Sequence, residues 1–252
     1  MDLKKAIRDR TSRRTYLDTP VSPLQLEKLE AAAWECNRST GLSIQIMTGK
    51  EEVFAGFKKG YGLFSGVRNY MAMVGKYDDP HLEEKIGYYG ESLVLLATSL
   101  GLGTCWVGLQ LDEEGMGCKL KTDEVLKCVI AFGNVKDAPT IREKLIYKGI
   151  HMRKSKEIKD MLVSETKVPN WVVEGMRCVV KAPSARNRQP VMFYYSAGGV
   201  MAKVKGDERY DLGIAKLHFE IGAGQGEWEF GNGGIFQYEP LELDWESSAE
   251  TK

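Results

Sequence analysis

The segment Pro183-Ser184-Ala185-Arg186-Asn187-Arg188-Gln189-Pro190 decides the fold that we expect for this chain of 252 residues. It places a serine, an asparagine and a glutamine between two prolines, and a β-type run follows at residues 191–196. These three side chains offer hydrogen-bond donors and acceptors to a polar ring edge, while proline restricts the loop. The alternative interpretation is a polar loop with Asx and Ser turns between a helix and a strand.

A second motif, Arg10-Thr11-Ser12-Arg13-Arg14, directly follows the charged helix expected at the N-terminus. In an extended segment, alternate residues share one side, so Arg10, Ser12 and Arg14 present two guanidinium groups and a hydroxyl together. Such a set can hold a phosphate dianion by charge-assisted hydrogen bonds. The alternative is a solvated basic turn that interacts with the C-terminal dipole of the helix.

A third motif, Gly101-Leu102-Gly103-Thr104-Cys105-Trp106-Val107-Gly108, follows a strongly apolar helix expected at residues 81–100. Glycines let the backbone approach a flat ring, and large apolar residues can wall it. Taken without the other motifs, this pattern is more typical of a helix stop. Cys105 has no His or Lys beside it in sequence, so we expect a wall residue and not an activated nucleophile.

Together the three motifs resemble the FMN-dependent nitroreductase family. The resemblance implies an α+β nitroreductase-like fold, an antiparallel mixed sheet packed by helices, over nearly the whole chain. It implies FMN as cofactor, NADH or NADPH as reductant, and a small-molecule electron acceptor such as a nitroaromatic or a quinone. One departure is Val191, where the family commonly has Trp.

The same resemblance assigns the binding residues. The arginine motif would grip the FMN phosphate, the Cys-Trp-Val-Gly segment would present backbone N–H groups to flavin N5 and O4, and the late loop would meet the pyrimidine edge. Arg153 matches a downstream basic residue that also reaches the phosphate, although a surface arginine near a helix start explains it equally well. Flavin carries the chemistry, so no catalytic side chain is expected. The expected cofactor-binding residues are Arg10, Ser12, Arg14, Cys105, Trp106, Val107, Gly108, Arg153, Pro183, Ser184, Asn187 and Gln189.

The order of the motifs predicts an internal duplication. In the family's usual homodimer the Pro-Ser-Ala-x-Asn-x-Gln-Pro loop follows the arginine motif closely in the same chain, and each flavin lies between two subunits. Here most of the chain separates them, and residues 87–106 and 213–228 form a weak repeat. We expect related halves at 1–165, with the phosphate side and ring-edge segment, and 166–252, with the pyrimidine-edge loop. They would form an intrachain pseudo-dimer with one FMN site complete in one chain, although exchange between chains stays open.

Periodicity predicts the remaining elements. Helices are expected at residues 22–36, 81–100, 155–163, 171–181 and 211–223, and strands at 42–47, 69–74, 126–132, 191–196, 200–204 and 235–238. The tail after Pro240 reads as a loose end.

Composition narrows the class of function. Lys and Arg together number 35, as do Asp and Glu, so the zero net charge argues against nucleic acid. Five scattered cysteines and three separated histidines predict neither disulfides nor a metal site. No apolar run reaches the ~20 residues of a membrane span, and the start lacks a secretory core, so we expect a cytoplasmic protein. Two rivals remain: a non-catalytic FMN-binding or redox-sensing protein, and a specialised nitroreductase-fold enzyme for ene reduction or dehalogenation.

Overall fold

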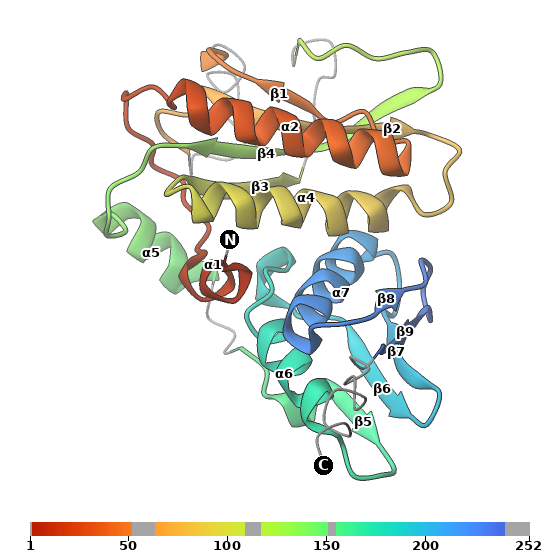
Figure 1. The fold of residues 1–252 in the computed structure, drawn as a ribbon. Helices are drawn as coiled ribbons and strands as arrows, with labels where there is room; N and C mark the ends of the chain where they lie inside the picture. Colours follow the sequence, from red (N-terminus) through yellow and green to blue (C-terminus); the bar gives the residue numbers. More distant parts are fainter. Residues whose placement is uncertain (1, 52–63, 109–116, 151–154, 240–252) are drawn as a thin grey trace, which may run out of the picture.

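The computed structural model describes residues 2–51, 64–108, 117–150 and 155–239. Two sheets form its outer layers, one with strand order β1-β2-β4-β3 and one with order β5-β6-β7-β9-β8. Helices α4 and α7 pack on each other between the two sheets (Figure 1). This arrangement confirms the α+β class expected from the sequence.

The four-stranded sheet is antiparallel throughout. It consists of β1 (Gln45–Met47), β2 (Asn69–Lys76), β3 (Gly103–Gly108) and β4 (Glu124–Gly133). Along β2, Met71 and Met73 point into one hydrophobic cluster, while Tyr70, Ala72 and Val74 point into another. This alternation is the two-residue period of a strand that is buried on both faces.

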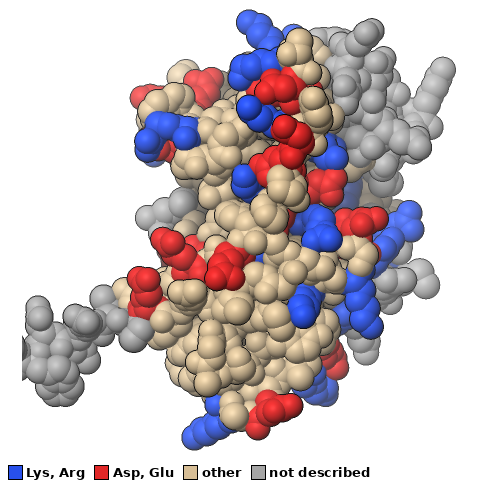
Figure 2. Space-filling model, turned by 90° about the vertical axis from the view of Figure 1, so that its right-hand side faces the viewer, with Lys and Arg blue, Asp and Glu red and all other residues tan. Residues whose placement is uncertain are grey.

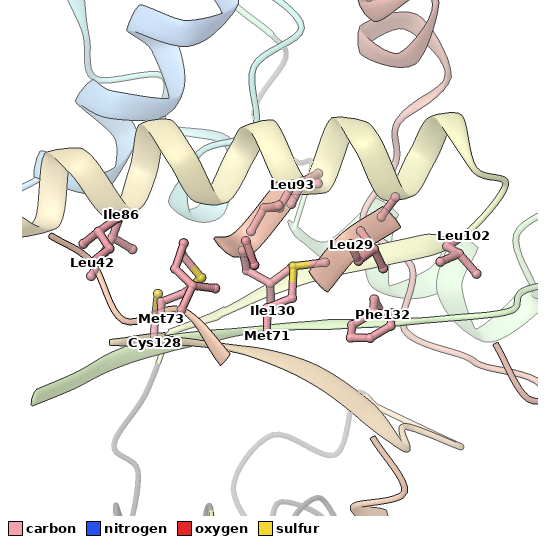
Figure 3. Close-up of a cluster of buried hydrophobic side chains, with 14 of the residues drawn as sticks. Leu29, Leu42, Met71, Met73, Ile86, Leu93, Leu102, Cys128, Ile130 and Phe132 are labelled. Carbon is pink, nitrogen blue, oxygen red and sulfur yellow. The ribbon is translucent and has the colours of Figure 1, made fainter. Parts of the chain in front are cut away.

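Helix α2 (Pro23–Thr40) covers the Met71 face of this sheet together with α4. Ser22 and Gln25 form a capping box at its start, proline occupies the first turn, and Gly41 ends it in a left-handed conformation. Figure 3 shows Leu29 of this helix packed with the strand side chains of the cluster. The helix predicted at 22–36 is therefore confirmed, and it runs four residues further.

Helix α4 (Leu82–Ser99) confirms the prediction of a buried central helix. One side packs on the four-stranded sheet through Ile86 and Leu93 (Figure 3). The other side packs on α7 and on α1 (Leu3–Asp9). A helix that is covered on several sides needs apolar residues around most of its circumference, as the sequence shows.

Helices α6 (Asn170–Val179) and α7 (Arg209–Ala223) pack on the five-stranded sheet, whose first strand is β5 (Leu162–Ser164). Its strands after β5 are β6 (Met192–Ser196), β7 (Gly199–Lys203), β8 (Glu227–Trp228) and β9 (Ile235–Gln237). Aromatic rings fill its core, and Phe219 contacts Phe193, Trp228 and Phe236. The β6–β7 hairpin, α6, α7 and β9 all occur where the sequence predicts them. The order β6-β7-β9-β8 also repeats the order β1-β2-β4-β3.

The helix predicted at residues 155–163 is wrong. A single 3-10 turn, Ile158–Asp160, is followed by β5 (Leu162–Ser164), which pairs with β6 in parallel. The Phe193 amide donates to the Met161 carbonyl at 2.8 Å. Pairing with a strand that comes later in the chain therefore overrides the local helical pattern, which a short segment cannot maintain alone.

Helices α4 and α7 approach each other at two glycines. A Cβ atom at Gly213 would lie 1.9 Å from the Glu84 carbonyl oxygen, and one at Gly87 would lie 2.2 Å from the Tyr210 carbonyl oxygen. Real Cβ atoms do not come so close to backbone atoms, so both positions require glycine at this helix spacing. Buried charges also cross this contact, because Lys216 of α7 donates to Glu84 of α4.

Charged side chains of both signs lie on the surface of the protein. On the face shown in Figure 2, basic and acidic side chains are interspersed over the upper part, and much of the lower part is uncharged. No helix among the described residues is long and apolar enough to cross a membrane. In the same ranges, no group of three His, Cys, Asp or Glu side chains could hold a metal ion. The tail after Pro240 lies outside the described residues.

Candidate functional site

The arginine motif lies against β3, so the structure brings the second and third predicted motifs together. Helix α1 is capped at its start by the Asp2 side chain and ends at Arg10, where the chain becomes extended. Ser12 then forms a parallel bridge with Thr104, and the Arg13 amide donates to the Thr104 carbonyl at 2.7 Å. Strand β3 is an edge of the four-stranded sheet, which leaves its outer side to the arginine motif.

The buried carboxylate of Glu143 fixes the backbone of this motif. Its Oε1 accepts from the Arg14 amide at 2.8 Å, the Thr15 amide at 3.2 Å and the Arg13 Nε at 3.3 Å. Its Oε2 accepts from the Thr140 amide at 2.8 Å. Burial would raise the pKa of Glu143, but these hydrogen bonds and the Arg13 charge outweigh burial and lower the pKa to about 2.

Tyr147 of α5 (Ile141–Ile150) supports the other side of the motif. Its hydroxyl donates to the Ser12 carbonyl, and the Arg14 guanidinium lies 5.9 Å from its ring centre. The Arg14 Nη1 also donates to the Ser12 carbonyl at 3.4 Å. A cation over an aromatic ring is attracted to its face, so Tyr147 holds the Arg14 side chain beside Ser12.

Cys105 is a buried thiol close to the arginine motif. Burial raises the pKa of Cys105, and the nearby charges of Arg14 and Arg10 act in the opposite direction without overcoming burial. The thiol therefore stays protonated near neutral pH and is a poor nucleophile. The role of Cys105 as a wall of the ligand site stays a prediction.

The Arg10 side chain is only 11% exposed, and its Nε is buried without a hydrogen-bond partner in the described structure. The closest carboxylate oxygen, Glu91 Oε1, is 3.8 Å away, which is too long for a hydrogen bond. A buried donor without a partner costs about 1–3 kcal/mol. This arginine is therefore suited to an acceptor from outside the chain.

Glu91 is a fully buried carboxylate of α4 that joins several elements. Its Oε2 accepts from the Trp106 indole N–H of β3 at 2.8 Å, and its Oε1 lies 3.0 Å from Nε2 of His218 on α7. The Trp106 ring also packs over Gly90, where a Cβ atom would lie 2.5 Å from it. The Trp106 side chain thus packs against α4, and its indole N–H is bonded within the protein.

The late loop, residues 183–190, lies beside α7 in cyan in Figure 1. The Ala185 amide donates to Asp211 in the first turn of α7 at 3.2 Å. Within the 3-10 turn Ala185–Asn187, Arg186 and Asn187 have φ values of 53° and 51°. Such left-handed values are uncommon outside glycine and often mark functional sites.

Gln189 is bonded to other parts of the protein through its side chain and its backbone. Its φ is 46°, and its side chain is buried. The Oε1 accepts from the Lys156 amide at 2.7 Å, and the Nε2 donates to the Val180 carbonyl at 3.2 Å. The Gln189 amide donates to Ser184 Oγ at 2.9 Å. These hydrogen bonds hold the loop in its conformation, so the side-chain amide of Gln189 is already bonded within the protein.

The remaining predicted residues differ in their exposure to solvent. Val107 is buried, Gly108 is exposed at the end of β3, and Pro183, Ser184 and Asn187 are partly exposed. Arg153 lies outside the described residues.

A separate cavity of about 750 Å³ lies at the opposite edge of the four-stranded sheet. None of the predicted binding residues lines it; its walls include Trp34, Arg38 and Lys121. The Asn37 side chain in its wall bonds both backbone groups of Ile44, at 2.7 and 2.9 Å. The Asn37 amide thus already serves the fold, and the cavity lies apart from the candidate site.

Four residues of the site were not found from the sequence: Glu91, Glu143, Tyr147 and His218. For Glu143 a signal existed, because Thr140-Ile141-Arg142-Glu143 reads as a capping box, and Thr140 and Glu143 do exchange its two hydrogen bonds. Glu91 and His218 lie on apolar helices where a lone charge gives no sign of its partner. Only the packing of α4 on α7 brings them together.

Comparison with known proteins gives a family match over most of the chain. Residues 2–223 match the family model described as "Putative TM nitroreductase". No curated protein matches the chain.

Among solved structures, a "putative nitroreductase" from Thermotoga maritima is 22% identical, with a TM-score of 0.62, and the match covers 94% of this chain and 92% of that one. An FMN-dependent nitroreductase from Clostridium difficile is 22% identical over 59% of this chain and 98% of its own, with a TM-score of 0.44. A "Putative NADH Oxidase" from Clostridium acetobutylicum is 24% identical over 59% and 99%, with a TM-score of 0.43. The first of these shows a shared fold along nearly the whole chain.

Proposed function

Because this chain belongs to the nitroreductase family described as "Putative TM nitroreductase", we propose that it is an FMN-dependent oxidoreductase. NADH or NADPH would reduce the flavin, and a nitroaromatic, a quinone or a similar small molecule would then be reduced in the same pocket. The observation that carries the proposal is the buried, unpartnered Nε of Arg10 beside Ser12, Arg14 and β3. The family expectation places the flavin phosphate at this point.

The residues present fit a phosphate. Arg10 has a donor without a partner, and the Arg14 guanidinium is held by a ring face and a carbonyl, which leave other donors of its fork for a ligand. The Glu143 carboxylate accepts hydrogen bonds from the Arg14 amide and from Arg13 Nε. It therefore holds the arginine motif in place without contacting the Arg10 side chain. A preorganised cationic segment loses little conformational entropy when it binds an anion. Arg153 would add a further cation by family resemblance alone.

Bound flavin would supply the transfer of electrons between nicotinamide and acceptor. The chain's own part is to bind and orient. Along the outer edge of β3, the backbone from Cys105 to Gly108 would face the ring, with the protonated Cys105 thiol as an inert wall. Pro183, Ser184 and Asn187 would meet the pyrimidine edge, and Gln189 would hold their loop in shape through its bonds to Lys156 and Val180.

We also propose that the chain is an internal pseudo-dimer with halves at residues 1–165 and 166–252. Support comes from topology, because the strands β1 to β4 and the strands β6 to β9 follow the same plan. In each set a helix precedes the first strand, a helix connects the second and third strands, and the fourth strand pairs between the second and third. The two inner helices, α4 and α7, pack on each other through Gly87 and Gly213, which the weak sequence repeat aligns. One flavin site would then lie between the halves of a single chain.

The first prediction is that the protein prefers FMN to riboflavin and that Arg10→Ala reduces this preference. Loss of a charge-assisted hydrogen bond costs about 1.5–3 kcal/mol, so we expect FMN affinity to fall roughly 10- to 100-fold and riboflavin affinity to stay the same. Flavin fluorescence titration measures both dissociation constants. Steady NADH oxidation with a nitroaromatic or a quinone would separate an oxidoreductase from a protein that only binds FMN.

The matched control is Arg8→Ala, which removes an exposed arginine from the last turn of α1, two residues before Arg10. This variant should bind FMN as the wild type does. Equal affinity of the wild type for FMN and riboflavin would contradict the phosphate assignment.

The second prediction concerns stoichiometry: each chain binds one FMN by itself. An Arg10→Ala/Arg14→Ala double variant lacks the phosphate side, and Asn187→Ala weakens the proposed ring side. If the two sides of a site come from one chain, mixing these variants restores no FMN binding beyond the sum of the two alone. Recovery of one tight site per pair of chains would show that sites form between chains, against the proposal.

A further inference from the structure

Glu91 has two nitrogen-bearing neighbours, His218 and Arg10, and only His218 lies within hydrogen-bond distance of its carboxylate. His218 Nε2 lies 3.0 Å from Glu91 Oε1, whereas Arg10 Nε lies 3.8 Å from the same oxygen. The other oxygen, Oε2, is taken by the Trp106 indole at 2.8 Å. Glu91 and His218 are fully buried, so bulk water does not separate or screen these two groups. The histidine thus occupies the carboxylate oxygen that is nearest to Arg10.

The surroundings of His218 fix the orientation of its ring. Its Nδ1 lies 3.1 Å from the Cys178 carbonyl of α6, and a carbonyl only accepts hydrogen bonds. Nδ1 therefore carries a proton, and Nε2 faces Glu91. A second proton lies between Nε2 and Oε1, because two bare acceptors at 3.0 Å would repel each other. The ring is held between α6 and α4.

We propose that His218 is a positioning residue that keeps Arg10 free for the cofactor phosphate by occupying Glu91 Oε1. An arginine and a carboxylate in a buried site attract each other strongly, so a free Oε1 would draw the Arg10 guanidinium into a direct ion pair. That ion pair would consume the donor that is now without a partner. This inference rests on the proposed function, because it assigns the phosphate to Arg10.

The C-terminal part of the chain would thus contribute to phosphate binding through His218. His218 belongs to α7 and the Cys178 carbonyl to α6, whereas Arg10, Glu91 and Trp106 belong to the N-terminal part. Changes in the packing of α7 on α4 would therefore reach the phosphate site through a single hydrogen bond. The contact between Glu84 and Lys216 crosses the same pair of helices without contacting Arg10.

The test is the variant His218→Asn, whose side-chain N–H₂ can still donate to the Cys178 carbonyl but which is too short to reach Glu91. We expect its FMN dissociation constant to rise about tenfold, the scale typical when a partner that orients a binding group is lost. Its riboflavin dissociation constant should stay within about twofold, because riboflavin has no phosphate for Arg10 to bind. Both constants are measured by fluorescence titration of the apoprotein.

Rescue distinguishes positioning from a general structural role. Adding Glu91→Gln to His218→Asn removes the charge that would capture Arg10, so the double variant should recover FMN affinity to within about threefold of the wild type. Glu220→Gln is the matched control, because Glu220 makes another polar contact between α7 and α4, with Tyr88. It should leave the ratio of the two affinities unchanged.

The outcomes are separable. An equal loss of FMN and riboflavin affinity in His218→Asn, or a loss that Glu91→Gln does not rescue, would overturn the positioning role and leave the proposed function in place. Unchanged FMN affinity in His218→Asn would overturn it as well. A wild type that shows no preference for FMN would instead remove the phosphate assignment and this inference with it.

Discussion

Replacing Gly213 by alanine is expected to lower the free energy of unfolding by about 3 kcal/mol or more, at the upper end for overpacking in a core. The new Cβ would lie 1.9 Å from the Glu84 carbonyl oxygen and 2.7 Å from the Tyr88 amide nitrogen. Both are backbone atoms of α4, so a side-chain rotation cannot relieve the clash. In an exposed helix the change from glycine to alanine would stabilise the protein by about 1 kcal/mol. The sign of the measured change in stability therefore shows whether α4 and α7 are in close contact at Gly213.

Urea denaturation followed by circular dichroism measures this effect. Gly198→Ala is the matched control, because that glycine lies in a hairpin turn with space around it and without a left-handed φ. It should change stability by less than about 0.5 kcal/mol. Gly87→Ala should resemble Gly213→Ala, since its Cβ would meet the Tyr210 carbonyl. A Gly213→Ala protein as stable as the wild type would contradict the close approach of α4 and α7.

The variant Glu143→Gln is expected to lose about 3 kcal/mol of stability at pH 7 and to lose FMN affinity as well. Glutamine has only one acceptor oxygen, whereas both Glu143 oxygens now accept hydrogen bonds from the arginine motif and Thr140. Buried donors would be left unpaired, and the segment from Arg13 to Thr15 would lose its anchor. Chemical denaturation and flavin titration measure the two losses.

The pH dependence of this loss follows from the pKa of Glu143. The folded state lowers it from 4.5 to about 2, so its contribution to stability is fully present above pH 4.5. That contribution is lost as the pH falls from 4.5 towards 2, where the folded protein also takes up the proton. A shift of this size corresponds to about 3 kcal/mol. The difference between wild type and Glu143→Gln should therefore shrink over this interval.

An exposed glutamate provides the comparison for Glu143. Glu35 pairs with Arg38 on the surface of α2, where ion pairs contribute about 0–1 kcal/mol. Glu35→Gln should thus change stability little at any pH between 2 and 7. If Glu143→Gln destabilised the protein equally at pH 3 and pH 7, the carboxylate charge would not be the cause.

The local patterns of the sequence determined most of the elements. Capping at Ser22 and the 3.6-residue period defined α2 and α4, and the two-residue period defined β2, β4 and the β6–β7 hairpin. These patterns are local because hydrogen bonding within a helix and side-chain alternation along a strand involve near neighbours. The contact of the arginine motif with β3 agrees with a site built from these two motifs.

Other features were decided only by tertiary structure. Residues 155–163 have the composition of a short helix, yet β5 forms there because β6 offers a backbone edge to pair with. Gln189 was expected to bind the ligand, and the structure places its side chain in hydrogen bonds with the Lys156 amide and the Val180 carbonyl. The pairing of Glu91 with His218, which lie far apart in sequence, requires α4 and α7 to pack at glycine spacing. Sequence periodicity shows which residues are buried, but it does not show which buried charges meet, because that depends on how the helices pack against each other.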